Sequence, residues 1–158
     1  MAKITIGVIE VEGSDSFVAK TTEALTLLSK SSAFCGISNY LGKILEAQRS
    51  GMRANEDPPT YDVGQATWMA NVIWYASTIA HDTYHSYLYH MAGLRSAQVP
   101  EDAWKGADAE KKCNEFQVLV LKQLKKTNEQ TVSYYINYLQ QLMASGTDYY
   151  SNYAGRNW

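Results

Sequence analysis

The spacing of apolar residues divides the chain into a strand-forming N-terminal part and a longer helix-forming part. From Lys3 to Val11, Ile and Val alternate loosely with polar residues, which predicts a strand. The sequence GSDS at Gly13–Ser16 follows as a turn and a helix N-cap. Apolar residues then recur with helical spacing from Phe17 to roughly Lys30, which predicts an amphipathic helix.

The pattern between residues 34 and 92 is less uniform. Phe34 to Ala47 fits either a strand or a short helix, and we favour a strand. Ser50 to Gly64 is expected to be extended and loop-like, because Pro58 and Pro59 exclude a helix there. Gln65 to Ala92 contains neither Gly nor Pro, so a single long helix ending at Gly93 is predicted.

The last third of the chain is predicted to be helical. Pro100-Glu101-Asp102 resembles a helix start, and a loop is expected around Gly106. Ala107–Lys126 and Thr131–Ala144 predict two further helices, the second stopped by Gly146, before a polar and aromatic tail. The predicted fold class is therefore α+β, with a small N-terminal sheet followed by a helical majority, in a single domain of residues 1–158.

Composition narrows the class of protein without naming a function. A hydrophobic content of 46% and a charged content of 19% are ordinary for a folded domain. The net charge of −2 gives no reason to expect a nucleic-acid or membrane-surface partner. The two cysteines, Cys35 and Cys113, are too few for a disulfide framework or a CxxC zinc site. The sequence does not indicate an oligomeric state.

The N-terminus and the hydropathy profile bear on location. Glu10 and Glu12 interrupt the apolar start, so no signal peptide is expected. No apolar run approaches the roughly 18 residues that a transmembrane helix requires. We therefore expect a cytoplasmic protein, while export by a signal-independent route, or release as a piece of a larger protein, stays open.

The chain has three histidines, and all lie in the stretch IAHDTYHSYLYH. On a helix, His81 and His85 would lie on one face, one turn apart, which is how two imidazoles bind one metal ion. Asp82 would project about 100° to the side, where it could act as a general base on a metal-activated water. The alternative is a structural pair that packs and forms hydrogen bonds. The adjacent acid and the absence of other histidines favour metal binding.

The sequence His81-Asp82-Thr83-Tyr84-His85 is H-D-x-x-H, and it resembles the H-E-x-x-H active-site helix of zincin metallopeptidases. The resemblance covers Ile79 to His90 and one downstream acid. It implies a zinc peptidase with its metal between two helices and a peptide or protein as substrate. Because aspartate is one methylene shorter than glutamate, it also implies reduced or lost activity unless the helix lies closer to the reacting water.

A catalytic zinc needs three protein ligands and an open position. Glu110 falls in the middle of the apolar face of the helix predicted at 107–126, and a buried carboxylate there needs a cation. The resemblance to zincins with a glutamate ligand, the gluzincins, implies the same role for Glu110. Cys113 is a rival on the same face, and Glu115 points outward. Alternatively, Glu110 is a first-turn acid favoured by the helix dipole.

Further residues are assigned supporting roles. The gluzincin pattern implies that Asn114 accepts an N–H from a ligand imidazole, with Gln117 as another candidate. Candidates for stabilising an oxyanion include Tyr84 and His90, together with Tyr87 and Tyr89. His90 would point about 140° away from His85, so it is expected to cap, support or face substrate. In zincins an edge strand pairs with the peptide substrate, and Met52–Asn55 is expected to be that strand.

The leading hypothesis is a metal-dependent hydrolase, specifically a small zinc metallopeptidase. The alternative is a non-catalytic helical binding or interaction protein, including a zincin-like domain that binds metal without turnover. Two nitrogen ligands and one oxygen ligand would also accept Co, Mn, Ni or Fe. An HD-type phosphohydrolase is rejected, because it needs a histidine well upstream and none precedes His81.

Overall fold

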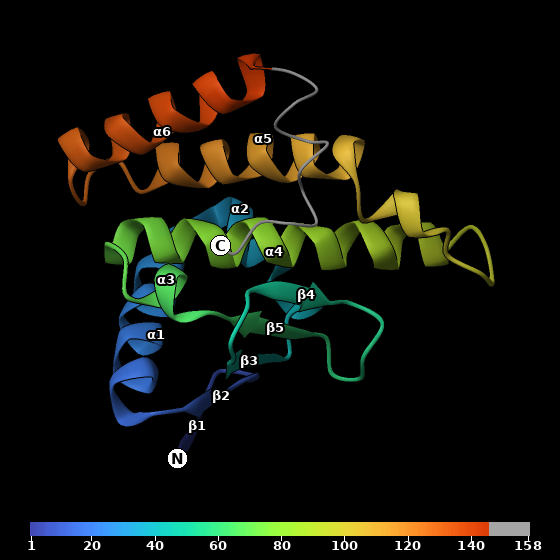
Figure 1. Ribbon diagram of the computed structural model, residues 1–158, viewed down its shortest axis with the longest axis horizontal. Helices are drawn as coiled ribbons and strands as arrows, with labels where there is room; N and C mark the ends of the chain where they lie inside the picture. Colours follow the sequence, from blue (N-terminus) through green and yellow to red (C-terminus); the bar gives the residue numbers. More distant parts are fainter. Residues whose placement is uncertain (146–158) are drawn as a thin grey trace.

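The computed structural model describes residues 1–145 and contains one mixed five-stranded sheet (Figure 1). The strand order is β1-β2-β3-β5-β4, with β1/β2 and β4/β5 antiparallel and the two central pairings parallel. The strands are β1 (Ala2–Ile6), β2 (Ile9–Gly13), β3 (Lys43–Glu46), β4 (Gly51–Arg53) and β5 (Thr60–Val63).

Helices make up most of the rest of the described chain, which confirms the predicted α+β class. Within residues 1–145, no helix is both long enough and apolar enough to cross a membrane. The helices are α1 (Asp15–Leu28), α2 (Ser32–Ile37), α3 (Gln65–Trp68), α4 (Val72–Gly93), α5 (Ala107–Gln123) and α6 (Glu129–Ala144), and the 3-10 turns are η1 (Ser38–Tyr40) and η2 (Glu101–Ala103).

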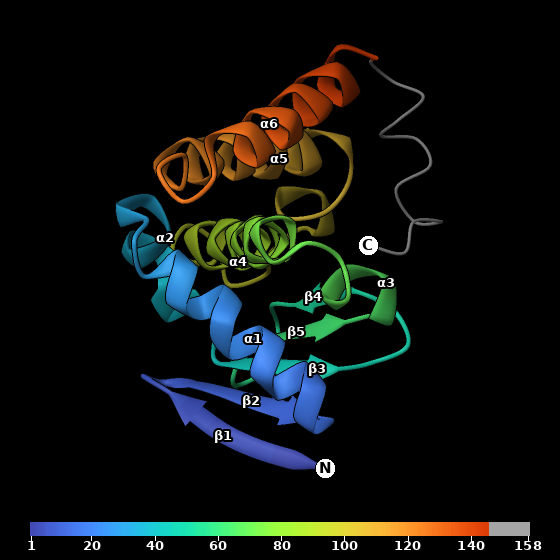
Figure 2. The same ribbon diagram turned by 90° about the vertical axis from the view of Figure 1, so that its left-hand side faces the viewer.

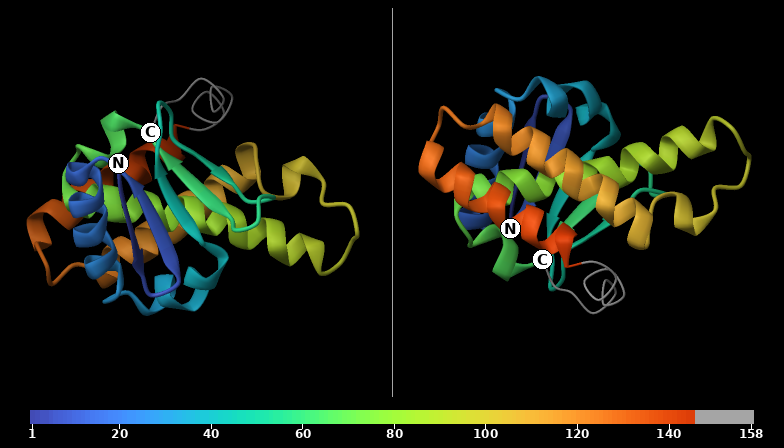
Figure 3. Two further views of the ribbon diagram at one scale, coloured as in Figure 1. Left: turned by 90° about the horizontal axis from the view of Figure 1, so that it is seen from below. Right: turned by 90° about the horizontal axis from the view of Figure 1, so that it is seen from above.

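The central element is α4, which lies between the sheet on one side and α5 and α6 on the other (Figure 2). Seen from below and above, α4 runs across the molecule alongside α5 (Figure 3). The helix α1 packs against β1, β2 and α4. Because α4 is covered on several sides, residues 75–83 are all buried, and that explains why the stretch lacks a simple polar face.

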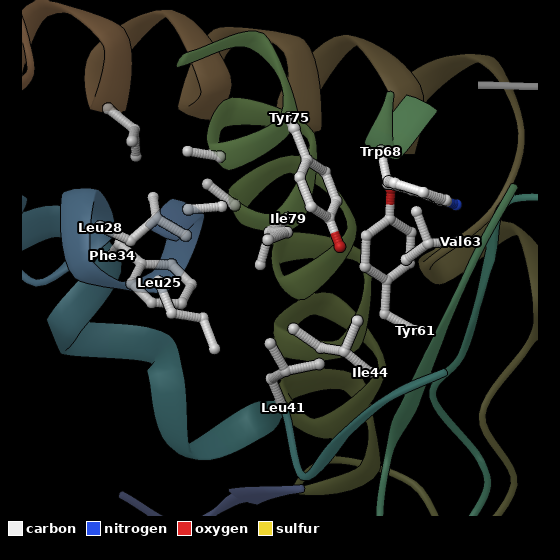
Figure 4. Close-up of a cluster of buried hydrophobic side chains, with 14 of the residues drawn as sticks. Leu25, Leu28, Phe34, Leu41, Ile44, Tyr61, Val63, Trp68, Tyr75 and Ile79 are labelled. Atoms are coloured by element: carbon white, nitrogen blue, oxygen red, sulfur yellow. The ribbon is translucent and has the colours of Figure 1, made fainter. Parts of the chain in front are cut away.

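The two faces of the sheet have opposite character. Val11, Ile44 and Tyr61 are register partners across β2, β3 and β5, and all three are fully buried. Figure 4 shows Ile44 and Tyr61 in one buried cluster with Ile79 of α4. The opposite face is polar, with Lys43 contacting two glutamates of β2 at 3.0 and 2.7 Å. This alternation fixes which face α4 covers.

The N-terminal prediction is partly wrong. Lys3–Val11 is not a single strand but the hairpin β1–β2, which turns at Gly7 and Val8. Gly7 has a φ of 61°, a left-handed conformation that glycine adopts without a Cβ clash. The isolated Gly7 within a strand pattern was the available signal. The following helix is confirmed as α1, and Ser14 is its N-cap, with a side chain that accepts a hydrogen bond from the Phe17 N–H.

The predicted helix over Gln65–Ala92 is also wrong as a single element. The chain forms the short α3, breaks after Trp68 and restarts as α4. The side chain of Asn71 accepts a hydrogen bond from the Ile73 N–H and so caps α4. The spacing of apolar residues does not reveal this break, because α3 and α4 both contribute buried residues to the core.

Predictions for the intervening and final segments differ in detail. Phe34–Ala47 contains both alternatives, since α2 and η1 precede β3. Ser50–Gly64 is not simply a loop, because it contains β4 and β5; the expected edge strand at Met52–Asn55 overlaps β4. Pro100 precedes only the short turn η2. The last two helices are confirmed as α5 and α6, whereas Gly146 and the tail lie outside the described residues.

Ile44→Ala tests whether the packing of the sheet beneath α4 stabilises the fold. Removing this fully buried side chain from the central strand is expected to lower the free energy of unfolding by about 2–5 kcal/mol. Ile4→Ala is the matched control, because Ile4 is 37% exposed on the edge strand β1. Urea denaturation measures both. Equal losses for the two variants would contradict the central role of Ile44.

Candidate metal centre

The interface between α4 and α5 buries a group of polar side chains. The two helices run antiparallel, because residues later in α4 contact residues earlier in α5. His81 and His85 lie one turn apart on α4, as their spacing predicts, and both face α5. Glu110, in the first turn of α5, is fully buried opposite them. The structure thus brings together the three residues that the sequence assigned as metal ligands.

The Glu110 carboxylate lies between the two imidazoles. His81 Nε2 is 3.0 Å from Glu110 Oε1, and His85 Nε2 is 3.2 Å from Glu110 Oε2. Zinc–ligand bonds of about 2.0–2.2 Å in a tetrahedral arrangement place neighbouring ligand atoms about 3.3 Å apart. Each of these two separations, one to each carboxylate oxygen, is slightly shorter than that spacing and is also that of a hydrogen-bonded ion pair.

A chain of hydrogen bonds sets the orientation of the His81 ring. The Ser77 hydroxyl donates to the Trp74 carbonyl oxygen, and the Gln117 amide N–H donates to Ser77 Oγ at 2.9 Å. The amide oxygen of Gln117 therefore faces His81 Nδ1, at 2.9 Å, and must accept from it. This contact places the proton of a neutral His81 on Nδ1 and leaves the electron pair of Nε2 directed at Glu110.

The same logic applies to His85. Its Nδ1 lies 2.6 Å from the Trp104 backbone oxygen, which can only accept a hydrogen bond. A neutral His85 therefore also carries its proton on Nδ1 and turns the electron pair of Nε2 towards Glu110. Metal-binding histidines usually have this arrangement, with the remote N–H held by an amide, carboxylate or backbone oxygen.

The buried carboxylate and the two imidazoles shift one another's pKa values. Burial alone would raise the pKa of Glu110, but the facing histidines outweigh burial and lower it to about 2. Burial alone would lower the pKa of His81, but Glu110 outweighs that effect and raises it to about 9. Among residues 1–145, Glu110 Oε1 accepts no well-aligned hydrogen bond despite its burial. A proton or a metal ion between these groups would satisfy the carboxylate.

Cys113 lies in the same cluster. It is fully buried one turn after Glu110, and its Sγ and one nitrogen from each of His81 and His85 all lie within 4.8 Å of one another. The cluster His81, His85 and Cys113 could hold a metal ion. The sequence interpretation treated Cys113 only as a rival to Glu110, whereas the structure places both residues beside the histidines.

Asp82 is buried next to the cluster. Burial raises its pKa above the usual value, although the neighbouring imidazoles and a hydrogen bond from Tyr61 act in the opposite direction. A small cavity, with about 10 Å³ open to the centre of a water molecule, is lined by Thr78, His81, Asp82 and Gln117. That volume is about what one water needs.

Three supporting assignments receive different outcomes. The residue that holds an imidazole N–H is Gln117, so the expectation for Asn114 is wrong; Asn114 is buried, with no hydrogen-bond partner for its amide within the described chain. His90 Nδ1 lies 2.7 Å from the Ser86 backbone oxygen, and its ring packs on tyrosines at 40 and 89. Tyr84 stacks on Phe116, and its proposed part in stabilising an oxyanion stays a prediction.

Sequence reasoning missed two groups. Tyr61, on β5, donates a hydrogen bond from its hydroxyl to Thr78 Oγ1 at 3.3 Å and lies close enough to Asp82 to affect its pKa. The alternating segment Thr60–Val63 was the signal, but two preceding prolines suggested a loop. The other group is the Trp104 carbonyl, which orients His85. A backbone oxygen has no signature in the sequence.

Comparisons with known proteins do not assign a family or a function to this chain. No family model, curated protein or solved structure matches this chain. The resemblance to zincins therefore depends on the H-D-x-x-H spacing and on Glu110. What the structure adds is that these residues meet at the interface between α4 and α5.

Proposed function

We propose that this protein is a metal-dependent hydrolase that binds zinc through His81, His85 and Glu110. The observation that supports this proposal is the convergence of two Nε2 atoms on one buried carboxylate, while both Nδ1 atoms face hydrogen-bond acceptors. One proton can satisfy only one of the two Nε2 atoms. Two protons would place two imidazolium rings with centroids 5.2 Å apart in a buried site. One divalent cation satisfies all three groups.

Zinc suits this donor set best. Two imidazole nitrogens and a carboxylate oxygen form the His₂Glu ligand set of catalytic zinc sites, which leaves a fourth position open. Zinc bound there supplies a Lewis acid that activates water and polarises a carbonyl group. Magnesium and calcium are hard cations, and their protein sites use oxygen ligands almost exclusively. The two imidazole nitrogens therefore disfavour these ions.

Asp82 is the general base in this proposal. Its carboxylate adjoins His81 and shares with it a cavity for about one water. Asp82 would take a proton from that water and deliver it to the leaving amine. Tyr61 of β5 lies near this carboxylate. The shorter aspartate side chain is compensated if this cavity brings the water next to the carboxylate.

A peptide is the proposed substrate. Within residues 1–145, β4 is the edge strand next to β5, and it also contacts α4. An extended peptide could add to such an edge through backbone hydrogen bonds, which would place a backbone carbonyl near the helix that carries the site.

A second candidate function is a non-catalytic binding or interaction protein. The observation that favours it is the His81–Glu110 ion pair itself, since a pKa of about 9 would keep His81 protonated without any metal. In that case the cluster would stabilise the α4–α5 interface and would have no chemical role. Metal content separates the two candidates.

Elemental mass spectrometry of the purified, untagged protein should find about one zinc per chain. His81→Ala and Glu110→Ala should each lose the metal, because each removes a ligand on which the site depends. His90→Ala is the matched control and should keep it, since His90 is a histidine of the same helix outside the cluster. If the parent takes up no stoichiometric metal even when zinc is supplied, the hydrolase proposal fails and the interaction protein is favoured.

Gln117→Leu tests the hydrogen bond that orients His81. Losing the acceptor for Nδ1–H should weaken zinc affinity roughly 10- to 100-fold, measured by competition with a chromophoric chelator. Gln117→Glu keeps an acceptor at the same place and should retain affinity. An unchanged affinity in Gln117→Leu would show that this amide does not support a ligand.

Asp82→Asn tests catalysis separately from metal binding. It should keep its zinc and lose roughly 100- to 10,000-fold in the rate of peptide hydrolysis, because the amide cannot accept the proton. Asp82→Glu restores a base and should retain activity. A mixture of diverse peptides analysed by mass spectrometry gives the readout. If the parent and Asp82→Glu both bind zinc yet cleave nothing, the peptidase proposal is wrong.

A further inference from the structure

Cys113 faces the same point as the proposed zinc ligands. It lies three residues after Glu110 on α5, so both side chains lie on one face of the helix, one turn apart. Its side chain is fully buried, and its Sγ belongs to the group of possible ligand atoms with His81 and His85. A buried cysteine often packs as a small apolar residue. Here its neighbours are metal-ligating groups instead.

We infer that Cys113 is a fourth, displaceable ligand that closes the metal site in its resting state. The inference depends on the proposed function, because it requires a metal held by His81, His85 and Glu110. Four protein ligands make a closed site of the structural type, whereas three leave a position for reactants. Cys113 would therefore determine whether the site is closed or open.

Glu110 is held by ion pairs with both histidines, which makes Cys113 the displaceable member of the set. With zinc bonds of about 2.3 Å to sulfur and 2.0–2.1 Å to nitrogen, the sulfur and nitrogen atoms would lie about 3.6 Å apart. Sγ lies within 4.8 Å of the histidine nitrogens, so a shift of at most about 1.2 Å brings it to that spacing. The Glu110 oxygens are already 3.0 and 3.2 Å from those imidazoles.

Cys113 and the small cavity beside Asp82 are separate features of the cluster. The cavity beside Asp82 is lined by Thr78, His81, Asp82 and Gln117, and among the described residues Cys113 does not line it. Closing the site forms a metal–sulfur bond, releases the thiol proton to solvent and expels a water from the fourth position. Opening the site breaks the metal–sulfur bond, returns the proton to the thiol and lets water back into the fourth position. No other reactant is needed in either direction.

X-ray absorption at the zinc edge tests the inference on the full chain loaded with zinc. The parent should show a sulfur scatterer at about 2.3 Å beside nitrogen and oxygen scatterers at about 2.0–2.2 Å. Cys113→Ala and Cys113→Ser should each bind zinc and lose the sulfur scatterer. Cys35→Ser is the matched control and should keep it, because Cys35 is the exposed cysteine.

Displacement is tested by adding acetohydroxamate, a small zinc chelator, to the same zinc-loaded parent. The sulfur scatterer should disappear and be replaced by oxygen. A sulfur scatterer that persists at saturation would overturn the displaceable role and indicate a permanently closed site. Zinc bound only by nitrogen and oxygen in the parent would overturn the inference while leaving the proposed function intact. A parent that binds no zinc would overturn both.

Discussion

The carboxylate of Glu110 is fully buried between α4 and α5, and removing an ionised carboxylate from water costs several kcal/mol unless a cation compensates. The interface is arranged around this requirement. Two imidazoles present Nε2 to its oxygens, and acceptors behind each ring hold the opposite nitrogen. Without positive charge between α4 and α5, three electron-rich groups would oppose one another in a region with little water.

The rest of the fold holds the histidines rigidly enough for this arrangement. α4 is packed against the sheet on one side and against α5 on the other. The sheet also contributes directly, because Tyr61 reaches from β5 to Thr78 and Asp82. Sites that are built on packed helices and strands keep ligand positions better than sites on loops. The buried middle of α4 therefore serves the core and the site together.

The chemistry available to the cluster depends on what occupies the position beside Glu110. With water next to Asp82, the residues match a hydrolytic site with a base of reduced length. With Cys113 in that position, the same residues form a closed site that only stabilises the α4–α5 interface. Both arrangements use the same buried carboxylate and the same two histidines. In the proposal, they differ in the position of one side chain, that of Cys113.

The sequence by itself determined the α+β class, the face shared by His81 and His85, and the burial of Glu110. These are local properties of the sequence. Helical periodicity shows which residues share a face, and Glu110 falls on the apolar face of its helix while most other charged residues of that helix fall on the opposite face. Only the tertiary structure decided that Gln117, and not Asn114, holds an imidazole N–H, and that the Trp104 carbonyl holds the other. The reason is physical: those contacts depend on how α4, α5 and the preceding loop pack, and periodicity within one helix contains no information about its register against another.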